Sequence, residues 1–198
     1  DDSSSDDTVV KIELWLAINK GLFDSVTIIR HEVNVGVPLN FASVVEASRS
    51  NFIKITAGDD VYSFENIVEY TRSISDFDLI TSFHHFLIDS ELVASNFQAF
   101  NVLATNEIYA NVPYYERLKH IFFSYAPTMV YDSRLLKSKA VLDFVCSFET
   151  TEDFPLHVMM SKIRGSDFKH RHSNSVMIYY RRTEQSIFKI RKEEFNRD

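Results

Sequence analysis

The chain has 198 residues, of which 45% are hydrophobic and 14% aromatic, and it carries a formal net charge of −7. This composition supplies enough apolar surface for a substantial core and excludes disordered and collagen-like proteins. A single cysteine, Cys146, excludes an internal disulfide and a thiolate metal cluster, which favours a reducing, intracellular compartment. No apolar run is long enough to span a bilayer, so we expect no membrane partner.

The first part of the chain predicts β-structure. Residues 1–7 form an acidic, serine-rich leader that we expect to be disordered. Apolar and polar residues alternate from 11 to 18, which is the period of a strand, and Gly21 lies in a turn signal before a β-branched run. The pattern predicts a hairpin over 10–35, with a helix over 9–18 as the alternative.

The next part of the chain predicts helices. A short strand over 52–56 ends at a turn, and Ser63 is then the expected N-cap of a first helix with apolar residues at helical spacing. Ser75 and Asp78 form a capping-box pattern, which predicts a second helix that continues to Leu87.

Beyond these helices the pattern returns to strands. Residues 97–110 predict short extended segments, and Pro113 marks the start of a third helix that ends near Tyr125. The remainder predicts a meander of antiparallel strands. The expected strands cover residues 128–133, 139–149, 156–164, 174–183 and 186–192.

These elements divide the chain into three expected regions. The leader, 1–7, precedes an N-terminal β region over 8–60, and an α+β domain follows over 61–198. The residues of 12–32 and 142–163 show a similar pattern. This similarity leaves open that the β region is the sheet half of a repeated unit.

Three segments carry a resemblance to a known family: the junction 73–80 leading to Phe86, the extended segment 97–109 and the helix start 113–118. In their order they resemble the NTF2-like superfamily over residues 61–192. The resemblance implies an α+β fold in which three helices pack on a curved, mainly antiparallel sheet, with the N-terminal hairpin added to it. It also implies a pocket at the open end of the cone.

Asp143 is the candidate general base. It lies between Val141 and Val145 in a predicted strand, so on an inward face burial would raise its pKa. Tyr131 and Tyr179 would then be the donors that stabilise an enolate-like oxyanion. If the face points outward, Asp143 is solvated and none of the three is catalytic, and this is the reading that we favour.

The histidines predict no metal site. His84 and His85 lie in the second predicted helix, where adjacent side chains point about 100° apart and cannot both bind one ion. His170 and His172 are flanked by cations that repel a metal, so we expect a solvated basic loop. We therefore expect no metal and no cofactor.

Positive charge gathers in the last part of the chain. Residues 155–198 contain ten Lys or Arg against five Asp or Glu, and aromatic residues alternate with them. This pattern is typical of the solvent face of strands, and nucleic-acid or phosphate binding is the alternative. The basic patch comprises Arg164, Lys169, Arg171, Arg181, Arg182, Lys189 and Arg191.

No glycine-rich phosphate loop, nucleophile elbow or His-Glu-x-x-His motif is present. The sequence therefore predicts a non-enzymatic domain that binds a protein partner or a second copy of itself. A small-molecule or isomerase-like and hydratase-like pocket in the cone is the first alternative. Nucleic-acid or phosphate binding through the basic strands is the second.

Overall fold

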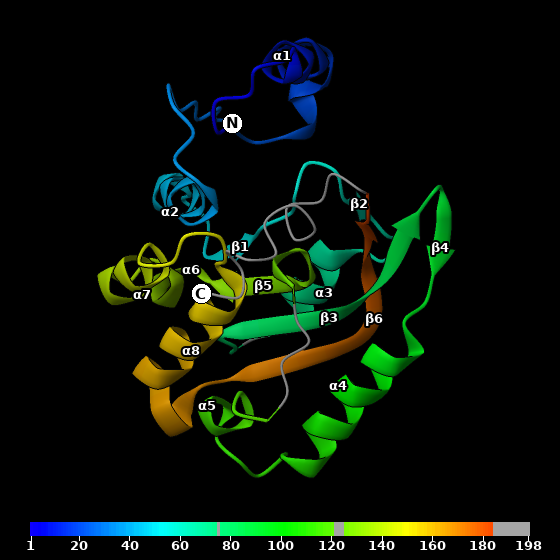
Figure 1. Cartoon of the computed structure of the whole chain (residues 1–198), viewed down its shortest axis with the longest axis vertical. Coiled ribbons are helices and arrows are strands. Elements are labelled where there is room, and N and C mark those ends of the chain that lie inside the picture. Colours follow the sequence, from blue (N-terminus) through cyan, green and yellow to red (C-terminus); the bar gives the residue numbers. More distant parts are fainter. Residues whose placement is uncertain (75, 121–124, 184–198) are drawn as a thin grey trace.

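A curled, six-stranded sheet forms the centre of the computed structural model, which describes residues 1–74, 76–120 and 125–183 (Figure 1). The strands lie in the order β1, β5, β3, β6 and β2, and β4 pairs with β3 outside this path. Their bounds are β1 Phe52–Lys54, β2 Val61–Tyr62, β3 Leu79–Ile88, β4 Glu91–Val93, β5 Met129–Asp132 and β6 His170–Arg181.

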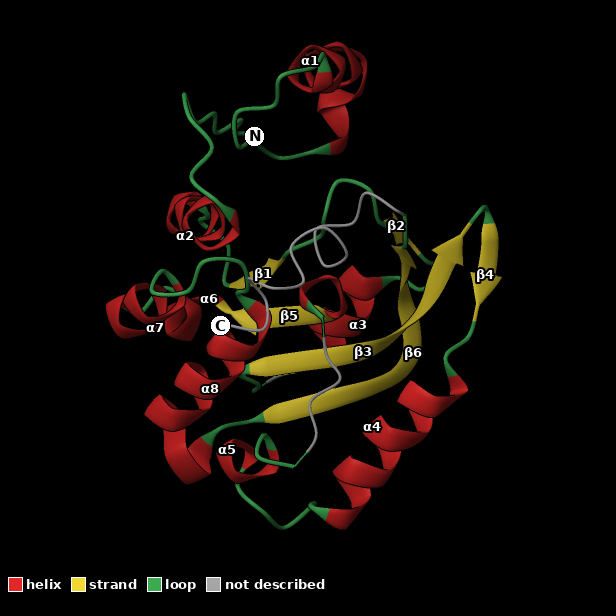
Figure 2. Cartoon of the chain, in the orientation of Figure 1, coloured by secondary structure: helices red, strands yellow, loops and turns green. Residues whose placement is uncertain are grey.

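Helices cover two sides of this sheet, as Figure 2 shows by colour. The α6, α7 and α8 helices lie beside the start of β3, and α4 lies along the opposite side. The bounds are α1 Thr8–Asn19, α2 Val37–Ala47, α3 Ile67–Ser73, α4 Asn96–Ile108, α5 Tyr114–Arg117, α6 Ser133–Leu136, α7 Lys139–Val145 and α8 Asp153–Arg164. The predicted α+β class is confirmed.

The strand directions determine which ends of the sheet coincide. β3 runs antiparallel to β5, which runs antiparallel to β1, whereas β3 and β6 are parallel from Leu79 opposite His170 to Leu87 opposite Arg181. The other pairings are antiparallel, so the prediction of a mainly antiparallel sheet is confirmed. As a result, the carboxyl ends of β1, β3 and β6 point the same way.

The main core lies between the sheet and helices α2, α7 and α8. Leu79 and Tyr131 contribute from β3 and β5, while Val141, Val145 and Leu156 contribute from α7 and α8, and all five are fully buried. Burying an aliphatic side chain of this size contributes about 1.5–3 kcal/mol. Residues 141 and 145 are four apart, so one helix face presents both to the sheet.

The predicted hairpin over 10–35 is wrong, because α1 occupies its first half and the helical alternative over 9–18 is confirmed. None of the α1 residues is buried, so no core neighbour enforces the strand period that the alternation suggested. The leader also has fixed partners: the Asp2 carboxylate accepts hydrogen bonds from Val35 N and Gly36 N at 2.8 and 3.0 Å.

The second predicted helix is wrong, because Leu79–Ile88 is the central strand β3. β5 and β6 pair with its two edges, so a run of apolar residues suits it better than a helical stripe. Asp89 and Ser90 both have positive φ, at 48° and 70°, as a two-residue hairpin turn to β4 requires. Within the described chain, Asp78 caps no helix and accepts a hydrogen bond from Lys169 N.

Three predicted extended segments are also wrong, because they are helices α4, α7 and α8. Ser95 caps α4 by accepting a hydrogen bond from Gln98 N. Short apolar runs in α7 and α8 fit either period, and packing on one face of the sheet selects the helix. The third predicted helix is shorter than expected, since α5 ends at Arg117, and the strand over 186–192 lies outside the described residues.

The strands expected over 52–56, 128–133 and 174–183 are confirmed as β1, β5 and β6, although β6 begins earlier, at His170. The first predicted helix is confirmed as α3, but its N-cap is Asn66, whose side chain accepts a hydrogen bond from Glu69 N. Ser63 instead donates to Val176 O in the neighbouring strand.

Candidate functional site

Groups with perturbed pKa values gather around Tyr180, near the carboxyl end of β6. Burial raises the pKa of Tyr180 to about 12, and the charges of Asp60 and Asp153 add to this shift. Asp60 lies just before β2, and Asp153 begins α8. Because such shifts concentrate where low dielectric and charged partners coincide, this end of the sheet is the candidate functional site.

Aromatic rings form the floor of this site. Tyr125 stacks on Tyr180 with centroids 5.5 Å apart, and His84 meets Tyr125 edge-on at 5.1 Å. Gln98 of α4 fixes Tyr125 by donating a 2.8 Å hydrogen bond to its hydroxyl. Burial lowers the pKa of His84 to about 4, so at neutral pH the imidazole is uncharged and packs as an aromatic group.

Asp60 carries a buried carboxylate oxygen that has no hydrogen-bond partner among the described residues. Its Oδ1 accepts a 2.9 Å hydrogen bond from Arg181 N, whereas its Oδ2 is buried without a hydrogen-bond partner in the described part of the chain. Burial raises the pKa of this carboxyl group to about 6. An unpartnered buried oxygen is costly, and this cost is repaid when a cation or a donor binds to it.

Lys54 fastens the end of β1 to the loop that precedes β5. Its Nζ donates to Ile55 O at 2.7 Å, to Thr56 Oγ1 at 3.2 Å and to Pro127 O. Burial lowers the pKa of this ammonium to about 7. Since backbone and hydroxyl oxygens already occupy its donors, Lys54 positions the loop and is not a ligand-binding cation.

Two adjacent carboxyl groups stand at the start of α8. Asp153 Oδ1 accepts a 2.9 Å hydrogen bond from Ala126 N. Burial and the charge of Glu152 hold the pKa of Asp153 well above its usual range, and burial also raises that of Glu152. A carboxyl group with a raised pKa can accept a proton near neutral pH, which is the property of a general base.

Two arginines supply positive charge at the same edge. Arg181 Nε donates a 2.7 Å hydrogen bond to Asp59 O, which holds the loop before β2 against β6. The Arg182 guanidinium lies 4.1 Å from the centroid of the Phe86 ring, and its side chain is exposed to solvent. The site therefore combines an exposed cation, carboxyl groups with raised pKa values and an aromatic floor.

The structure does not bring the three predicted catalytic residues together. Asp143 lies exposed on α7 and forms a 2.6 Å ion pair with Lys139. Its side chain therefore faces solvent, as in the alternative that the sequence analysis favours. Tyr131 is fully buried in β5 and donates a 2.9 Å hydrogen bond to Met129 Sδ. Tyr179 is half-buried on β6, beside Tyr180 but opposite Val61 of β2.

The predicted basic patch divides between the two ends of β6. Arg164, Lys169 and Arg171 lie near its start, and Arg181 and Arg182 lie at its end. Lys189 and Arg191 lie outside the described residues. The division follows from the length of β6, whose 12 residues separate the two groups.

The expectation of a solvated histidine loop is wrong. His170 and His172 lie at the start of β6. Thr81 Oγ1 is within hydrogen-bond distance of both rings, at 2.8 Å from His170 Nε2 and 2.9 Å from His172 Nδ1. His84 and His85 lie on a strand, so their side chains point to opposite faces of it. Among the described residues, no group of three or more His, Cys, Asp or Glu side chains is arranged to hold a metal ion.

The sequence analysis did not identify the acidic residues of this site. Asp59 and Asp60 follow a short strand, and Glu152 and Asp153 precede Pro155. Carboxylates directly after a strand end are the signal that identifies such an edge, because ligands of open sheets bind at strand carboxyl ends.

In the described residues, no helix has the length and apolar character needed to cross a membrane.

Comparison with known proteins identifies a similar fold. No family model and no curated protein matches the chain, so the NTF2-like resemblance stays a prediction. The structure is similar to TarS 1-349 of S. aureus in complex with UDP, with a TM-score of 0.61 and 13% identity over 96% of this chain and 52% of that one. It is equally similar to TarS in complex with UDP-GlcNAc, with a TM-score of 0.61 and 14% identity over 94% of this chain and 49% of that one. The chain thus spans about half the length of these structures and shares their fold.

Proposed function

We propose that this chain binds a nucleoside diphosphate sugar and takes part in the transfer of that sugar to an acceptor hydroxyl. The observation that carries the proposal is a fold similarity over 96% of the chain to a protein bound to UDP. The second similar structure contains UDP-GlcNAc, a nucleotide sugar. Since one fold hosts many functions, the residues at the site must supply the remaining argument.

The place of the site supports this proposal. In open sheets with parallel strands, ligands bind beyond the carboxyl ends of the strands. Here β1, β3 and β6 share that direction, and the loop after β1 brings Asp60 to the end of β6 beside Arg181. The Tyr180 and Tyr125 rings offer a stacking surface at the same edge.

The charges of the site suit a diphosphate. The exposed Arg182 guanidinium would attract the phosphate groups, for which arginine has matching planar donors. A magnesium ion is usually held by one or two carboxylates together with substrate phosphates. Asp60 Oδ2, buried and without a partner among the described residues, fits the protein side of such a site, and the ion would neutralise charge on the leaving diphosphate.

Asp153 is the proposed general base. The acceptor hydroxyl oxygen would form a bond to the anomeric carbon of the sugar, while the bond from that carbon to the diphosphate oxygen breaks. The proton of the hydroxyl would pass to the Asp153 carboxylate, and the nucleoside diphosphate would leave with the bonding electrons. The hydrogen bond from Ala126 N and the side-chain hydrogen bond with Glu152 hold the Asp153 carboxyl group in place.

Isothermal titration with UDP tests this proposal, carried out with magnesium chloride and again with EDTA. We expect saturable binding that weakens in EDTA and in Asp60→Asn. Asp89→Asn, which removes an equal charge at the β3–β4 turn, is the matched control and should bind as the parent does. Absence of UDP binding, or binding that Asp60→Asn leaves unchanged, contradicts the assignment of this site.

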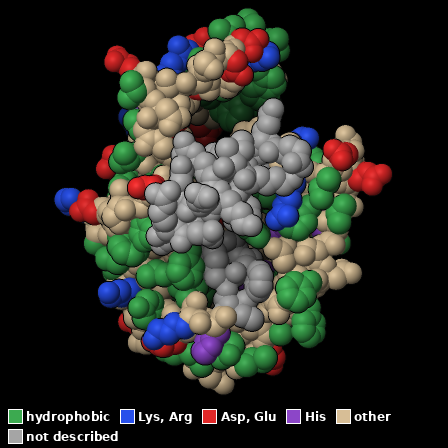
Figure 3. Space-filling model, viewed as in Figure 1, with side chains coloured by type: hydrophobic (Ala, Val, Ile, Leu, Met, Phe, Trp, Pro, Cys, Tyr) green, Lys and Arg blue, Asp and Glu red, His purple; other side chains and the backbone are tan. Residues whose placement is uncertain are grey.

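Self-association is a second candidate function, and an exposed apolar surface favours it. Phe100 and Ile108 of α4 are 70% and 71% exposed, and hydrophobic side chains gather over α4 at the lower right of Figure 3. Apolar patches of this kind mark protein interfaces. Light scattering at several concentrations tests it: a dimer that Phe100→Ser dissociates supports the role, and a monomer at every concentration contradicts it.

A further inference from the structure

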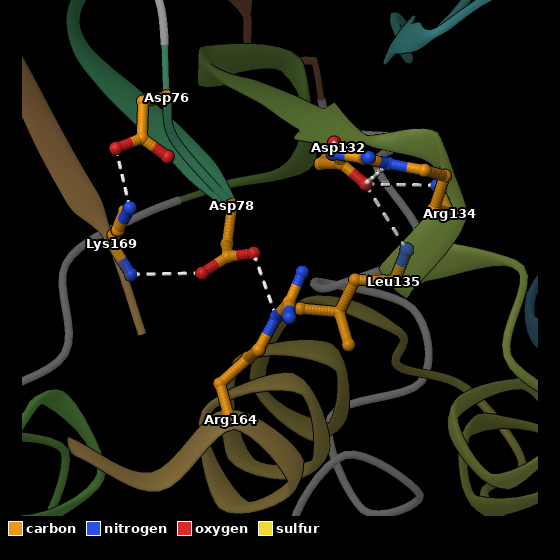
Figure 4. Close-up of polar contacts among 7 residues, drawn as sticks. All are labelled: Asp76, Asp78, Asp132, Arg134, Leu135, Arg164 and Lys169. Atoms are coloured by element: carbon orange, nitrogen blue, oxygen red, sulfur yellow. Dashed lines mark hydrogen bonds and ion pairs between the residues drawn. The ribbon is translucent and has the colours of Figure 1, made fainter. Parts of the chain in front are cut away.

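A cavity lies at the opposite end of β3 from the candidate site. Its volume is about 380 Å³, within the range of pockets that hold small molecules. Its lining comes from segments far apart in sequence: Asp78 directly before β3, Asp132 at the end of β5, Arg164 at the end of α8 and Lys169 directly before β6. Figure 4 shows these side chains facing a common space.

Buried carboxylates orient the arginines of this cavity. Asp78 Oδ1 accepts a 3.0 Å hydrogen bond from Arg164 Nε, and its Oδ2 accepts one of 2.9 Å from Lys169 N. Asp132 Oδ2 accepts a 2.8 Å hydrogen bond from Arg134 Nη2. Both carboxylates are buried and pair with guanidinium groups whose side chains are 43% exposed at Arg164 and 83% exposed at Arg134, so the arginines extend from these anchors towards solvent.

Several polar groups of the cavity have no partner among the described residues. Within the described residues, Arg164 donates a side-chain hydrogen bond through Nε alone and both of its Nη atoms lack a partner, as does Nη1 of Arg134. The Asp167 carboxylate, which is exposed, also has no hydrogen-bonding or ionic partner in the described chain. The cavity therefore offers free donors and a free acceptor at the same time.

An aromatic surface completes the lining. Phe52 stacks on Phe77 with ring centroids 4.8 Å apart and an interplanar angle of 21°. Phe77 is buried, whereas Phe52 is 39% exposed, so the pair presents an apolar face from a fixed position. Such a face suits the aliphatic C–H side of a ring.

The mixed charges of the lining favour a neutral ligand over a strongly charged one. Four aspartates face two arginines and one lysine, so an anion meets Asp167 and a cation meets the guanidinium groups. The carboxyl end of α8 adds partial negative charge from its last carbonyl groups, which opposes an anion further. A neutral ligand whose groups both donate and accept hydrogen bonds satisfies every free group of the cavity.

We infer that this cavity binds a neutral sugar unit, with hydroxyl groups paired to Arg164 and Asp167 and a ring face packed on Phe52. A hydroxyl both donates and accepts, so it matches a neighbouring carboxylate and guanidinium together. The inference does not depend on the proposed nucleotide site, because none of the groups assigned to nucleotide binding lines this cavity. It assigns the chain a carbohydrate-binding site apart from the carboxyl ends of β1, β3 and β6.

Saturation-transfer NMR with glucose, galactose and N-acetylglucosamine tests the inference on the whole chain. We expect at least one of the three to bind, with a millimolar dissociation constant, and to receive the strongest transfer at its C–H protons. Arg164→Met and Asp167→Asn should each weaken binding by about tenfold, since each removes a charged hydrogen-bonding partner. Asp167 is exposed, and its side chain forms no hydrogen bond or ion pair with the described residues, so Asp167→Asn still tests the inference if Arg164→Met unfolds.

Matched controls separate this site from general effects. Lys162→Met removes an exposed charge from the same helix as Arg164, and Phe64→Ala removes an aromatic ring that is 99% exposed. Both should bind sugar as the parent does, whereas Phe52→Ala should not. Failure of all three sugars to bind overturns the inference, as does sugar binding that is unchanged in Asp167→Asn and Phe52→Ala. Binding of inorganic phosphate in place of sugar overturns it too, and identifies an anion site.

Discussion

The backbone N–H of Ala126 donates a 2.9 Å hydrogen bond to Asp153 Oδ1, and this contact joins the loop before β5 to the start of α8. Residues 27 positions apart thereby fix a carboxyl group near Tyr180, close to the carboxyl end of β6. Neither the loop at Ala126 nor the start of α8 by itself fixes the position of the Asp153 carboxyl group. Their contact makes Asp153 the group on which the proposed chemistry depends.

We expect Asp153→Asn to abolish sugar transfer and to preserve UDP binding. The asparagine Oδ1 still accepts the hydrogen bond from Ala126 N, but the amide takes no proton, and loss of a general base lowers the rate by about 100-fold or more. UDP release from UDP-GlcNAc measures the activity, and titration with UDP measures the binding. Asp143→Asn, an exposed residue of α7, should keep both, and a fully active Asp153→Asn variant contradicts the role.

We expect Asp60→Asn to stabilise the fold at pH 7.5 and to have little effect at pH 4. The folded state raises the pKa of Asp60 from 3.8 to about 6, so folding favours the protonated form, and stability is lost as the pH rises from the unfolded to the folded pKa. The amide removes that cost, about 1 kcal/mol once solvent screening of this half-buried group is considered. Thermal unfolding at both pH values measures the effect.

The variant keeps the acceptor for Arg181 N, so a loss of stability at pH 7.5 would show that the ionised carboxylate is already paired in the folded state. A higher melting temperature together with weaker UDP binding would instead mark Asp60 as a residue whose burial serves binding at the expense of stability.

We expect acid to destabilise the protein through its buried histidines. Burial lowers the pKa of His172 from 6.5 to about 4 and that of His157 to about 3. Stability is highest above pH 6.5, where each histidine is neutral in both states. It falls as the pH drops from 6.5 towards the pKa of the folded state, because the imidazole is protonated in the unfolded chain at a higher pH than in the folded one. For His172 the loss between pH 7.5 and pH 5 is about 2 kcal/mol.

Denaturant unfolding of His172→Gln across this pH range measures that contribution. The variant should lose less stability than the parent as the pH falls, whereas His120→Gln, at an exposed position, should follow the parent. Asp60 makes the protein more stable as the pH falls, which is opposite to the effect of the histidines. The measurement therefore compares the pH dependence of the free energy of unfolding between His172→Gln and the parent. Equal pH dependence in His172→Gln and the parent would contradict the prediction.

We expect Asp132→Ala to lower the free energy of unfolding by about 1–3 kcal/mol. The Asp132 carboxylate caps α6 by accepting hydrogen bonds from Arg134 N and Leu135 N at 2.9 and 3.2 Å, and it is buried. Urea unfolding measures the change. Asp132→Asn should recover part of it, because the amide oxygen still caps the helix, and an unchanged midpoint in Asp132→Ala would show that the cap contributes nothing.

The sequence predicted elements best where local chemistry and tertiary environment agree. β1, β5 and β6 are strands in which the residue types, the pattern and the sheet position all favour extension. The sequence failed at β3 and at α8, where a short apolar run fits two periods. Pairing on both edges selects the strand in the first case, and packing on the sheet selects the helix in the second.

The sequence by itself determined an α+β protein with a substantial hydrophobic core and one unpaired thiol, because these follow from composition and residue type. Only the tertiary structure decided that Asp60, Asp153 and Tyr180 share one edge of the sheet, and that Arg164 and Asp167 line a cavity at the other. Burial, strand direction and the contacts of loops such as the one at Ala126 create these groupings. They are properties of distance in space, which the order of residues along one chain does not contain.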